Sequence, residues 1–373
     1  MSLSGRIRIP GLVDLHVHFR EPGFEYKETI LSGSTAAMRA GYSDVFTMPN
    51  LLPAPDSLDH LNVQTAIIAR DSHIGVHPYA SITLGQKGEG ELVNIEALSS
   101  RVAGFSDDGR GIQDEQLMRQ AMQRIAAAGS IIVEHCEVNT LLRGGYIHEG
   151  TYAHTHNHRG ICSESEWREV ERNIRLSEET GCRLHVCHIS TKESVQLIRE
   201  AKARGVRVTA ETAPHYLLLN DGMLQEDGRW KMNPPIRSVA DQMALLAGIQ
   251  DGTIDVISTD HAPHSAEEKS KGLEHSAFGI VGIETAFPLL YTYLVKTGLL
   301  TMERLVEVMS TRAREIMGLP MDESWATFDL DANYTIDPGQ FVSKGHSTPF
   351  AGWEVWGKCV KNEYKGRVVY EAE

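Results

Sequence analysis

The sequence has little of what marks secreted, membrane or nucleic-acid-binding proteins. Its five cysteines among 373 residues are odd in number and lack the spacing of a disulfide framework, which predicts reduced thiols. No apolar run approaches the ~20 residues of a membrane span, and the first residues lack the apolar core of a signal peptide. The net charge of −14 argues against a nucleic-acid or anionic-membrane partner. We therefore expect a globular cytoplasmic protein.

What the sequence does have is a regular alternation of β-rich runs and helical patterns. The β-rich runs cover residues 11–19, 43–50, 77–84, 102–108, 130–136, 183–190, 206–215 and 254–264. Amphipathic stretches between them, such as 114–129, 191–205 and 238–252, end in glycine, a common helix stop. Strands that alternate with helices indicate right-handed βαβ units and a parallel sheet. Eight such units predict an α/β fold, the (β/α)₈ TIM barrel.

The pattern changes after residue 320. Residues 326–336 and 353–371 are typical of short antiparallel strands, which predicts a small β appendage. We expect two parts, a barrel domain over residues 11–320 and an appendage over 321–373 together with 1–10. Because so few residues precede the first barrel strand, we expect little N-terminal sequence to pair with these strands.

Polar side chains stand where the predicted barrel strands end, which is where TIM-barrel active sites lie. They are His16 and His18, Asp107 and Asp108, His135, His188, and Asp260 followed by His261 and His264. Alternation along a strand puts residues two apart on one face. Imidazole nitrogens and carboxylate oxygens are the ligands expected of a zinc site. The set as a whole therefore favours a metal centre.

Each of these strand-end residues, taken alone, has a simpler explanation than metal binding. A histidine at a strand end can be a satisfied core residue, and an aspartate there can cap a helix. The tract "HTHNH" at 154–158 lies in a polar segment, and we expect it to be solvated or packed in a loop. His185 precedes His188 by three residues and is expected to face away from the barrel interior. Cys182 and Cys187 are expected to be packing residues.

The strand ends carry recognisable motifs in a fixed order. They read "HVHFREPG" (16–23), "MPN" (48–50), "FSDDG" (105–109), "EHCE" (134–137), "HVCHIS" (185–190), "AETAPHYLLL" (210–219), "KMNPPIR" (231–237), "STDHAPH" (258–264) and "FGIVGIET" (278–285). An HxH motif alone is weak evidence, but the ordered set is specific. On these motifs, which span residues 11–320, the chain resembles the cyclic amidohydrolases and, within them, the single-chain bacterial dihydroorotases.

This resemblance implies a metal centre with defined ligands. The family's ligands map onto His16, His18 and Asp260 for one zinc ion, His135 and His188 for a second, and Asp108 between the two. Many cyclic amidohydrolases carry a carbamylated lysine where Asp108 stands, and residues 101–111 contain no lysine. One or two Zn²⁺ ions per chain are therefore both compatible with the sequence.

The resemblance also implies a set of substrate contacts. They map onto Arg20, Asn50, Asn233, His264 and the backbone at Phe278 and Gly279. A guanidinium offers a fixed donor fork for the carboxylate of dihydroorotate. From the residues alone, Arg20 could instead form a surface ion pair with Glu21, the asparagines could be turn residues, and His264 could be an idle loop residue.

The activity implied is the zinc-dependent, reversible cyclisation of N-carbamoyl-L-aspartate to L-dihydroorotate in pyrimidine (UMP) biosynthesis, with Asp260 as the catalytic proton carrier. Two alternatives stay open: another cyclic amidohydrolase (a hydantoinase or allantoinase), and an inactive barrel that serves as a scaffold for aspartate transcarbamoylase. We expect a small-molecule substrate, a homodimer and a possible association with aspartate transcarbamoylase. Relatives generally have a longer N-terminal segment, so the β appendage is expected to be truncated or incomplete.

Overall fold

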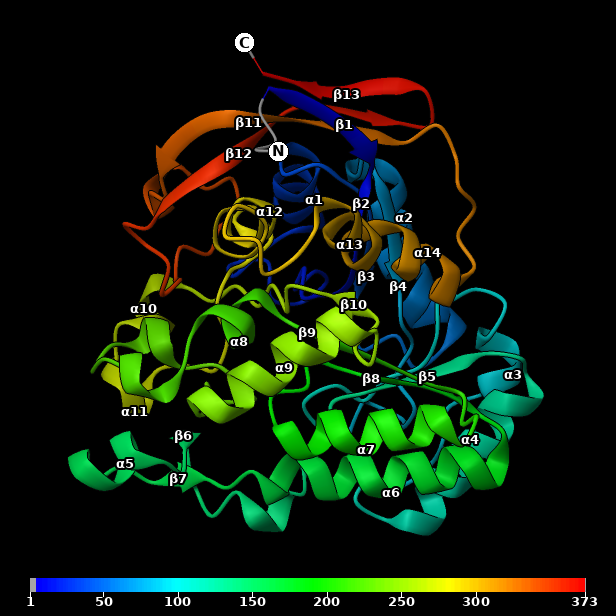
Figure 1. The fold of residues 1–373 in the computed structure, drawn as a ribbon. Coiled ribbons are helices and arrows are strands. Elements are labelled where there is room, and N and C mark those ends of the chain that lie inside the picture. Colours follow the sequence, from blue (N-terminus) through cyan, green and yellow to red (C-terminus); the bar gives the residue numbers. More distant parts are fainter. Residues whose placement is uncertain (1–4, 373) are drawn as a thin grey trace.

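The computed structural model describes residues 5–372 and has a set of parallel strands at its centre (Figure 1). The strands are β2 (Leu12–Val17), β3 (Tyr42–Thr47), β4 (Gly75–Pro78), β5 (Ile131–Glu134), β8 (Arg183–Val186), β9 (Val208–Thr212) and β10 (Val256–Ile257). Bridges from Phe105 to Ala80 and to Ile132 connect β4 with β5. A further parallel bridge between Val17 and His261 joins the last barrel segment to the first. The predicted TIM barrel is confirmed.

The fourth predicted strand is much shorter than expected. Of residues 102–108, only Phe105 forms β-bridges. The reason lies in Asp107, whose carboxylate accepts hydrogen bonds from the backbone N–H groups of Ile82 and Thr83 at 2.8 and 3.3 Å. A buried side chain thus satisfies backbone donors that a longer strand would have paired, and the chain turns away from the barrel at this point.

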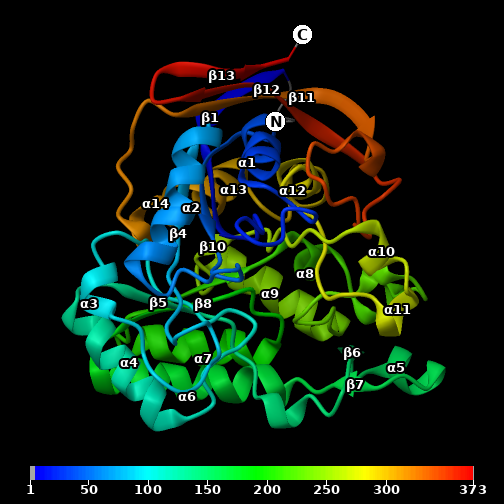
Figure 2. The same cartoon turned by 180° about the vertical axis from the view of Figure 1, so that it is seen from behind.

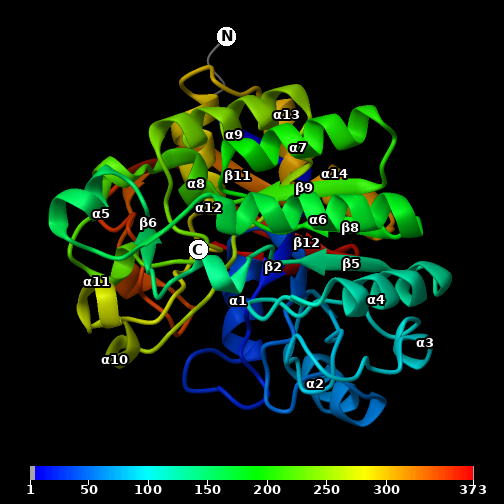
Figure 3. The ribbon, with the colours of Figure 1, turned by 90° about the horizontal axis from the view of Figure 1, so that it is seen from below.

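Helices cover the outside of the barrel (Figures 2 and 3). The longer ones are α1 (Ile30–Arg39), α2 (Leu58–Asp71), α4 (Glu115–Ala127), α6 (Glu164–Thr180), α7 (Lys192–Ala203) and α9 (Val239–Asp251). Shorter ones are α3 (Ile95–Leu98), α5 (Thr151–His156), α8 (Pro214–Leu218), α10 (Ala266–Lys269), α11 (Gly272–His275), α12 (Ala286–Leu290), α13 (Met302–Val306) and α14 (Arg312–Met317). The three helices predicted from periodicity each begin after a capping side chain: Asp114, Thr191 or Ser238. Such caps satisfy the free N–H groups of the first turn.

Two hydrophobic clusters hold the barrel together. The smaller one combines side chains from β2, β3 and β5 with Ala313 and Ile316 of α14. The larger one joins the outer faces of the strands to the surrounding helices. Both clusters consist of side chains less than 9% exposed, so the strand ends are fixed by dense packing on both faces of the sheet.

A second sheet lies across one side of the barrel, opposite α6 and α7 (Figure 1). Its antiparallel strands are, in order, β1 (Arg6–Pro10), β11 (Trp325–Thr335), β12 (Glu354–Tyr364) and β13 (Arg367–Glu371). All five residues of β1 pair with β11, so the short N-terminal segment takes a larger part in this sheet than the sequence led us to expect. A final pair of very short parallel strands, β6 (Ile147–His148) and β7 (Gly160–Ile161), flanks α5.

The terminal sheet packs directly on the barrel. Phe328 of β11 stacks on Phe287 of α12 with ring centroids 3.7 Å apart. The side-chain amide of Asn362 donates to the backbone carbonyls of Met38 and Tyr42, both at 2.8 Å. The division at residue 320 stays a prediction, and residues 1–4 and 373 of the predicted appendage lie outside the described chain. All five cysteines are free. Within residues 5–372, no helix has the length and apolar character needed to cross a membrane.

Candidate metal and substrate site

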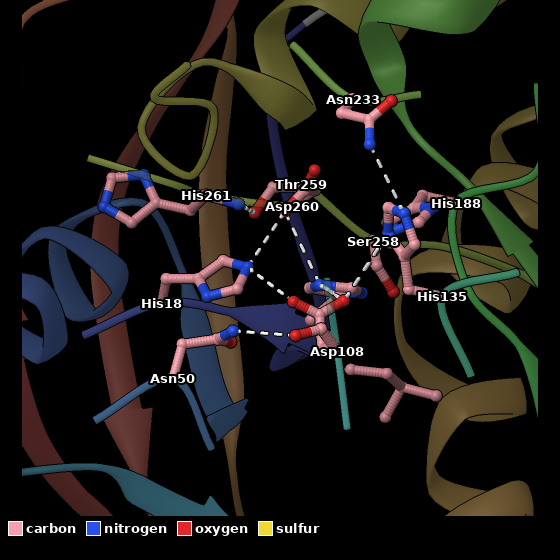
Figure 4. Close-up of polar contacts among 12 residues, drawn as sticks. His18, Asn50, Asp108, His135, His188, Asn233, Ser258, Thr259, Asp260 and His261 are labelled. Atoms are coloured by element: carbon pink, nitrogen blue, oxygen red, sulfur yellow. Dashed lines mark hydrogen bonds and ion pairs between the residues drawn. The ribbon is translucent and has the colours of Figure 1, made fainter. Parts of the chain in front are cut away.

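The polar residues at the strand ends converge on one pocket (Figure 4). It has a volume of about 250 Å³, and all the predicted site residues except His16 line it, together with Gly109 and Ala262. His16 is fully buried, and its Nε2 atom faces the lining residues Asp108 and Asp260, 3.5 Å from a carboxylate oxygen of each. Residues separated by more than 240 positions in sequence thus meet at one end of the barrel.

One half of the cluster combines the first and last barrel strands. Nε2 of His18 lies 3.3 Å from Oδ1 of Asp260, and Nε2 of His16 lies 3.5 Å from the same oxygen. All three ligand atoms lie within 4.8 Å of one another and are buried. This spacing is compatible with three ligands around one ion, since zinc holds nitrogen and oxygen ligands at about 2.0–2.2 Å.

The other half combines β5, β8 and the loop after Phe105. Nδ1 of His135 lies 2.9 Å from Nε2 of His188. Both nitrogens are 3.8 Å from Oδ1 of Asp108. Asp108 also reaches the first half, because its Oδ2 lies 3.6 Å from Nε2 of His18. Its carboxylate therefore lies between the two halves, as Figure 4 shows.

The unpartnered atoms and the charges of this cluster fit a bound cation. Nε2 of His16 and Oδ1 of Asp108 are buried and have no hydrogen-bond partner among the residues that the structure describes. Burial lowers the pKa of His16, but the nearby carboxylates of Asp260 and Asp108 outweigh burial and raise it to about 10. For Asp260 the two effects have the opposite signs. Burial raises the pKa of its carboxyl, but the imidazoles of His16, His188 and His18 outweigh burial and lower it to about 2. The site thus strongly favours positive charge between its carboxylates, which a divalent ion supplies.

A buried carboxylate behind His16 escaped the sequence analysis. Oε1 of Glu211, at the end of β9, lies 2.9 Å from Nδ1 of His16, and its Oε2 lies 3.1 Å from Nε2 of His185. The hydroxyl of Ser258 also donates to Glu211. A carboxylate that accepts the Nδ1 proton leaves Nε2 free to bind a metal and fixes the ring's orientation. The available signal was an acidic residue inside the otherwise uncharged, β-branched strand "VTAET".

The contact with Glu211 also corrects the expectation for His185. This histidine does not face away from the barrel interior, because it shares a carboxylate with His16. The expectation extended strand alternation from His185 to His188, but β8 ends at Val186. His188 then adopts a φ of +27°, so the alternation of strand side chains between the two faces of the sheet no longer applies to it.

Three residues of the site have backbone torsions that are uncommon for side chains other than glycine. Arg20, His188 and Asp260 have φ values of +57°, +27° and +48°. Such conformations persist only where the surrounding structure imposes them, and they cluster at functional sites. Here each lies within three residues of the end of a barrel strand, where the chain turns and directs a side chain into the pocket.

Arg20 is not paired with its neighbour Glu21. Oε2 of Glu21 accepts the backbone N–H of Ile30 at the start of α1. The Arg20 guanidinium instead donates to the Pro263 carbonyl at 3.3 Å and lies 3.4 Å from Nε2 of His264. Within residues 5–372 it has no carboxylate within 4 Å. A half-buried guanidinium that has no carboxylate partner in this part of the chain can receive an anionic group.

The two asparagines line the pocket and use their amide nitrogens there; Figure 4 shows the Asn233 nitrogen aimed at His135, 3.4 Å from its Nε2 atom. The Asn50 amide donates to the Asp108 carbonyl at 2.8 Å, and the Asn233 amide donates to Glu137 at 2.8 Å. The side-chain oxygens of both are buried, and no hydrogen-bond partner for them lies within residues 5–372. Such groups cost free energy unless a ligand supplies donors, and a cyclic amide has N–H groups to offer.

The remaining predicted contacts lie on one loop and the segment that faces it. Nε2 of His264 lies 2.8 Å from the Phe278 carbonyl, so this nitrogen carries the proton. Gly279 has a φ of +128°, and a Cβ there would lie 2.8 Å from the Ala262 carbonyl. A larger residue would therefore push the loop out of the pocket, which explains the glycine.

The other histidine tract lies away from the pocket. Residues 154–158 form the end of α5 and its cap rather than a loop. His156 stacks on Tyr152 with centroids 4.0 Å apart, and His158 bonds to Tyr146 and Glu226. Within residues 5–372, no group of three potential ligands includes this tract.

Comparison with known proteins agrees with this geometry. Residues 5–194 match the family model described as dihydro-orotase-like. A dihydroorotase of Bacillus caldolyticus is 48% identical over 382 residues, which cover 100% of this chain and 89% of that protein. One from Shouchella clausii is 48% identical over 379 residues, covering 99% of this chain and 88% of the relative.

The chain belongs to the dihydroorotase family. Among solved structures, an L-hydantoinase (dihydropyrimidinase) of Arthrobacter aurescens has a TM-score of 0.89 at 27% identity, covering 99% of this chain and 86% of its own. Membership identifies the protein as a metal-dependent cyclic amidohydrolase. The buried histidine and aspartate cluster at the strand ends is the site that this chemistry requires.

Proposed function

We propose that this chain catalyses the reversible cyclisation of N-carbamoyl-L-aspartate to L-dihydroorotate. The observation that carries the proposal is the Arg20 guanidinium, which has no carboxylate partner among residues 5–372 and opens to the same pocket as the metal-ligand cluster. Dihydroorotate combines a cyclic amide with a free carboxylate, so it needs a cation next to a hydrolytic centre. The free oxygens of Asn50 and Asn233 suit the N–H groups of the same ring.

We infer that the cluster holds one or two Zn²⁺ ions. His16, His18 and Asp260 would hold the first ion, His135 and His188 the second, and Asp108 would touch both. Nitrogen-rich ligand sets with a carboxylate favour zinc over magnesium or calcium. When bound, zinc lowers the pKa of water to about 7 and polarises a carbonyl oxygen.

Asp260 is our proposed catalytic proton carrier. As a carboxylate it accepts a proton from the attacking water, and it then delivers that proton to the ring nitrogen that leaves. Its φ of +48° turns the side chain into the pocket, next to the ligand nitrogens. In the direction of ring closure the same carboxyl moves the proton the opposite way, so one group serves both directions.

A hydantoinase activity is the alternative that a specific observation favours, since an L-hydantoinase shares the fold at 27% identity. Hydantoins lack the carboxylate that Arg20 would bind. A purely structural role as a scaffold has weaker support, because every position of the candidate metal centre is filled. Allantoinase activity also has weaker support, because no specific observation favours it. A purified sample assayed with dihydroorotate, hydantoin and allantoin, with metal content measured in parallel, tests the proposal. Turnover of hydantoin but not dihydroorotate would overturn it.

The homodimer and the association with aspartate transcarbamoylase stay predictions of the family resemblance. Light scattering of the purified protein, alone and mixed with aspartate transcarbamoylase, measures both directly. A mass of about twice the chain's 41.3 kDa is the expected result for the protein alone.

A further inference from the structure

The loop that carries Phe278 and Gly279 is attached to the rest of the molecule by a buried lysine. We propose that Lys269 is a positioning residue: its ammonium group holds this loop against the barrel, so that Phe278 and Gly279 stay in place to contact the substrate. The proposal rests on the function proposed above for the substrate itself. Lys269 is the last residue of α10, next to α11 at the edge of the molecule (Figure 3).

The contacts of Lys269 are unusual for a lysine. Its Nζ atom donates to three backbone carbonyls, those of Ala277 and Gly279 at 2.7 Å and that of Lys231 at 3.1 Å. A lysine ammonium has three N–H donors, so each one is used. Two of the acceptors flank Phe278, and the third lies on the segment that carries Asn233. One side chain thus joins the two segments that line this side of the pocket.

The surroundings of the Lys269 ammonium group indicate that it is stabilised mainly by the carbonyls it binds. Lys269 is 7% exposed, and within the described chain it forms no ion pair with any carboxylate within 4 Å. The charged groups around it are Lys231, Asp227 and Glu268. Burial, followed by the charge of Lys231, lowers the pKa of Lys269 to about 7. A cation kept in such a place without a counter-ion must gain its stability from the carbonyls it binds.

Neighbouring contacts show what this anchor controls. The Gly279 amide donates to the Lys231 carbonyl at 3.1 Å, and the Ala277 amide donates to the Glu268 carbonyl at 3.0 Å. Lys231 itself donates to the Glu274 carbonyl at 2.6 Å and lies 4.4 Å from the centre of the Phe278 ring. Without the ammonium, the carbonyls of Ala277 and Gly279 lose the donor that Lys269 supplies, while the Lys231 carbonyl keeps the Gly279 amide, so the loop loses one of its attachments near the pocket.

Replacement of Lys269 by methionine tests this role, because methionine keeps the length of the side chain and removes the charge and the donors. In K269M we expect hydrogen exchange of the Ala277 and Gly279 amides to become faster. We expect KM for dihydroorotate to rise about tenfold, corresponding to roughly 1.4 kcal/mol. The value of kcat should stay within about twofold, because lost substrate positioning by remote contacts falls on binding.

Lys271 provides the matched control. It lies two residues away, and its ammonium makes an exposed contact with Glu267 at 3.7 Å, so K271M should change neither exchange nor KM. If K269M does not fold, as judged by circular dichroism, K269Q replaces it, since glutamine keeps two N–H donors and should give a smaller change in the same direction.

The outcomes separate this proposal from the proposed function. Unchanged exchange in K269M overturns the anchor, and faster exchange with an unchanged KM overturns its role in substrate positioning. A fall in kcat with normal KM also overturns it. If the wild-type protein does not turn over dihydroorotate, the proposed function fails, whereas the exchange experiment still reports on the anchor.

Discussion

The two sides of the pocket are built in different ways. The metal side consists of side chains at the ends of barrel strands, with His16, His18 and Asp260 held by dense packing and by the closing bridge of the barrel. The substrate side consists of loop residues: Arg20 lies on the loop after β2, and Phe278 and Gly279 are held through the contacts of Lys269 with loop carbonyls. Rigid elements place chemical groups accurately, and loops supply contacts that can vary. The comparison predicts that damage to the metal side removes turnover, while damage to the substrate side weakens binding.

The largest effect should come from the metal side. His16→Ala or His18→Ala removes a ligand from a buried cluster, so we expect turnover below detection and a sharp loss of bound zinc. Metal analysis by mass spectrometry and a dihydroorotate assay check this. Full metal content and activity in either variant would mean that the strand ends do not form the metal site.

Asp260→Asn should separate chemistry from folding. The amide cannot carry the proton, so kcat is expected to fall by about 10²–10⁴-fold, the usual range for general acid–base catalysis. Thermal unfolding should show an intact fold. Near-normal rates would assign the proton transfer to another residue, and the neighbouring variant His261→Gln serves as a comparison outside the pocket lining.

Arg20→Met should sharpen the contrast, because it acts on the substrate side. A hydrogen bond to a charged group contributes roughly 1.5–3 kcal/mol, so KM for dihydroorotate is expected to rise about 10- to 100-fold. Steady-state kinetics measure the rise, and metal content should not change. Any residual activity toward hydantoin, which has no carboxylate, should be unaffected. Equal losses on both substrates would contradict the carboxylate role.

The smallest effect on turnover is expected for Glu211→Gln. The substitution keeps the shape of the side chain but removes the charge behind His16 and weakens the ring's orientation. Zinc affinity should fall about 10- to 100-fold, which a chelator competition measures, while activity at saturating zinc stays closer to normal. Thr209→Val, which removes the contact at 2.8 Å with His185, is the matched control. Equal zinc affinities in both variants would argue against this role for Glu211.

The sequence predicted the barrel because each strand and helix carries its own periodic pattern and stop signal. Local patterns could not predict where a side chain replaces backbone pairing, as Asp107 does when it shortens the fourth strand. Alternation also fails beyond the end of a strand, which is why the prediction for His185 was wrong.

Parts of the site were missed for a different physical reason. Glu211 acts through His16 and His185, which lie far from it in sequence, and Lys269 joins the Lys231 carbonyl to those of Ala277 and Gly279. No spacing rule reports such contacts, and the presence of a charged residue was the signal in both cases. By contrast, the ligand candidates share one property that sequence can reveal, namely their position at the ends of successive strands.

The bridge between Val17 and His261 joins the start of the barrel to its end, with His18 on one side and Asp260 on the other. An ion bound by both His18 and Asp260 would link the first and last barrel segments at the position where the barrel closes. During synthesis, about 240 further residues must follow the first strand before the segment that closes the barrel against it has been made. Tight capture of the ion would therefore mark the moment at which the ring of strands is complete.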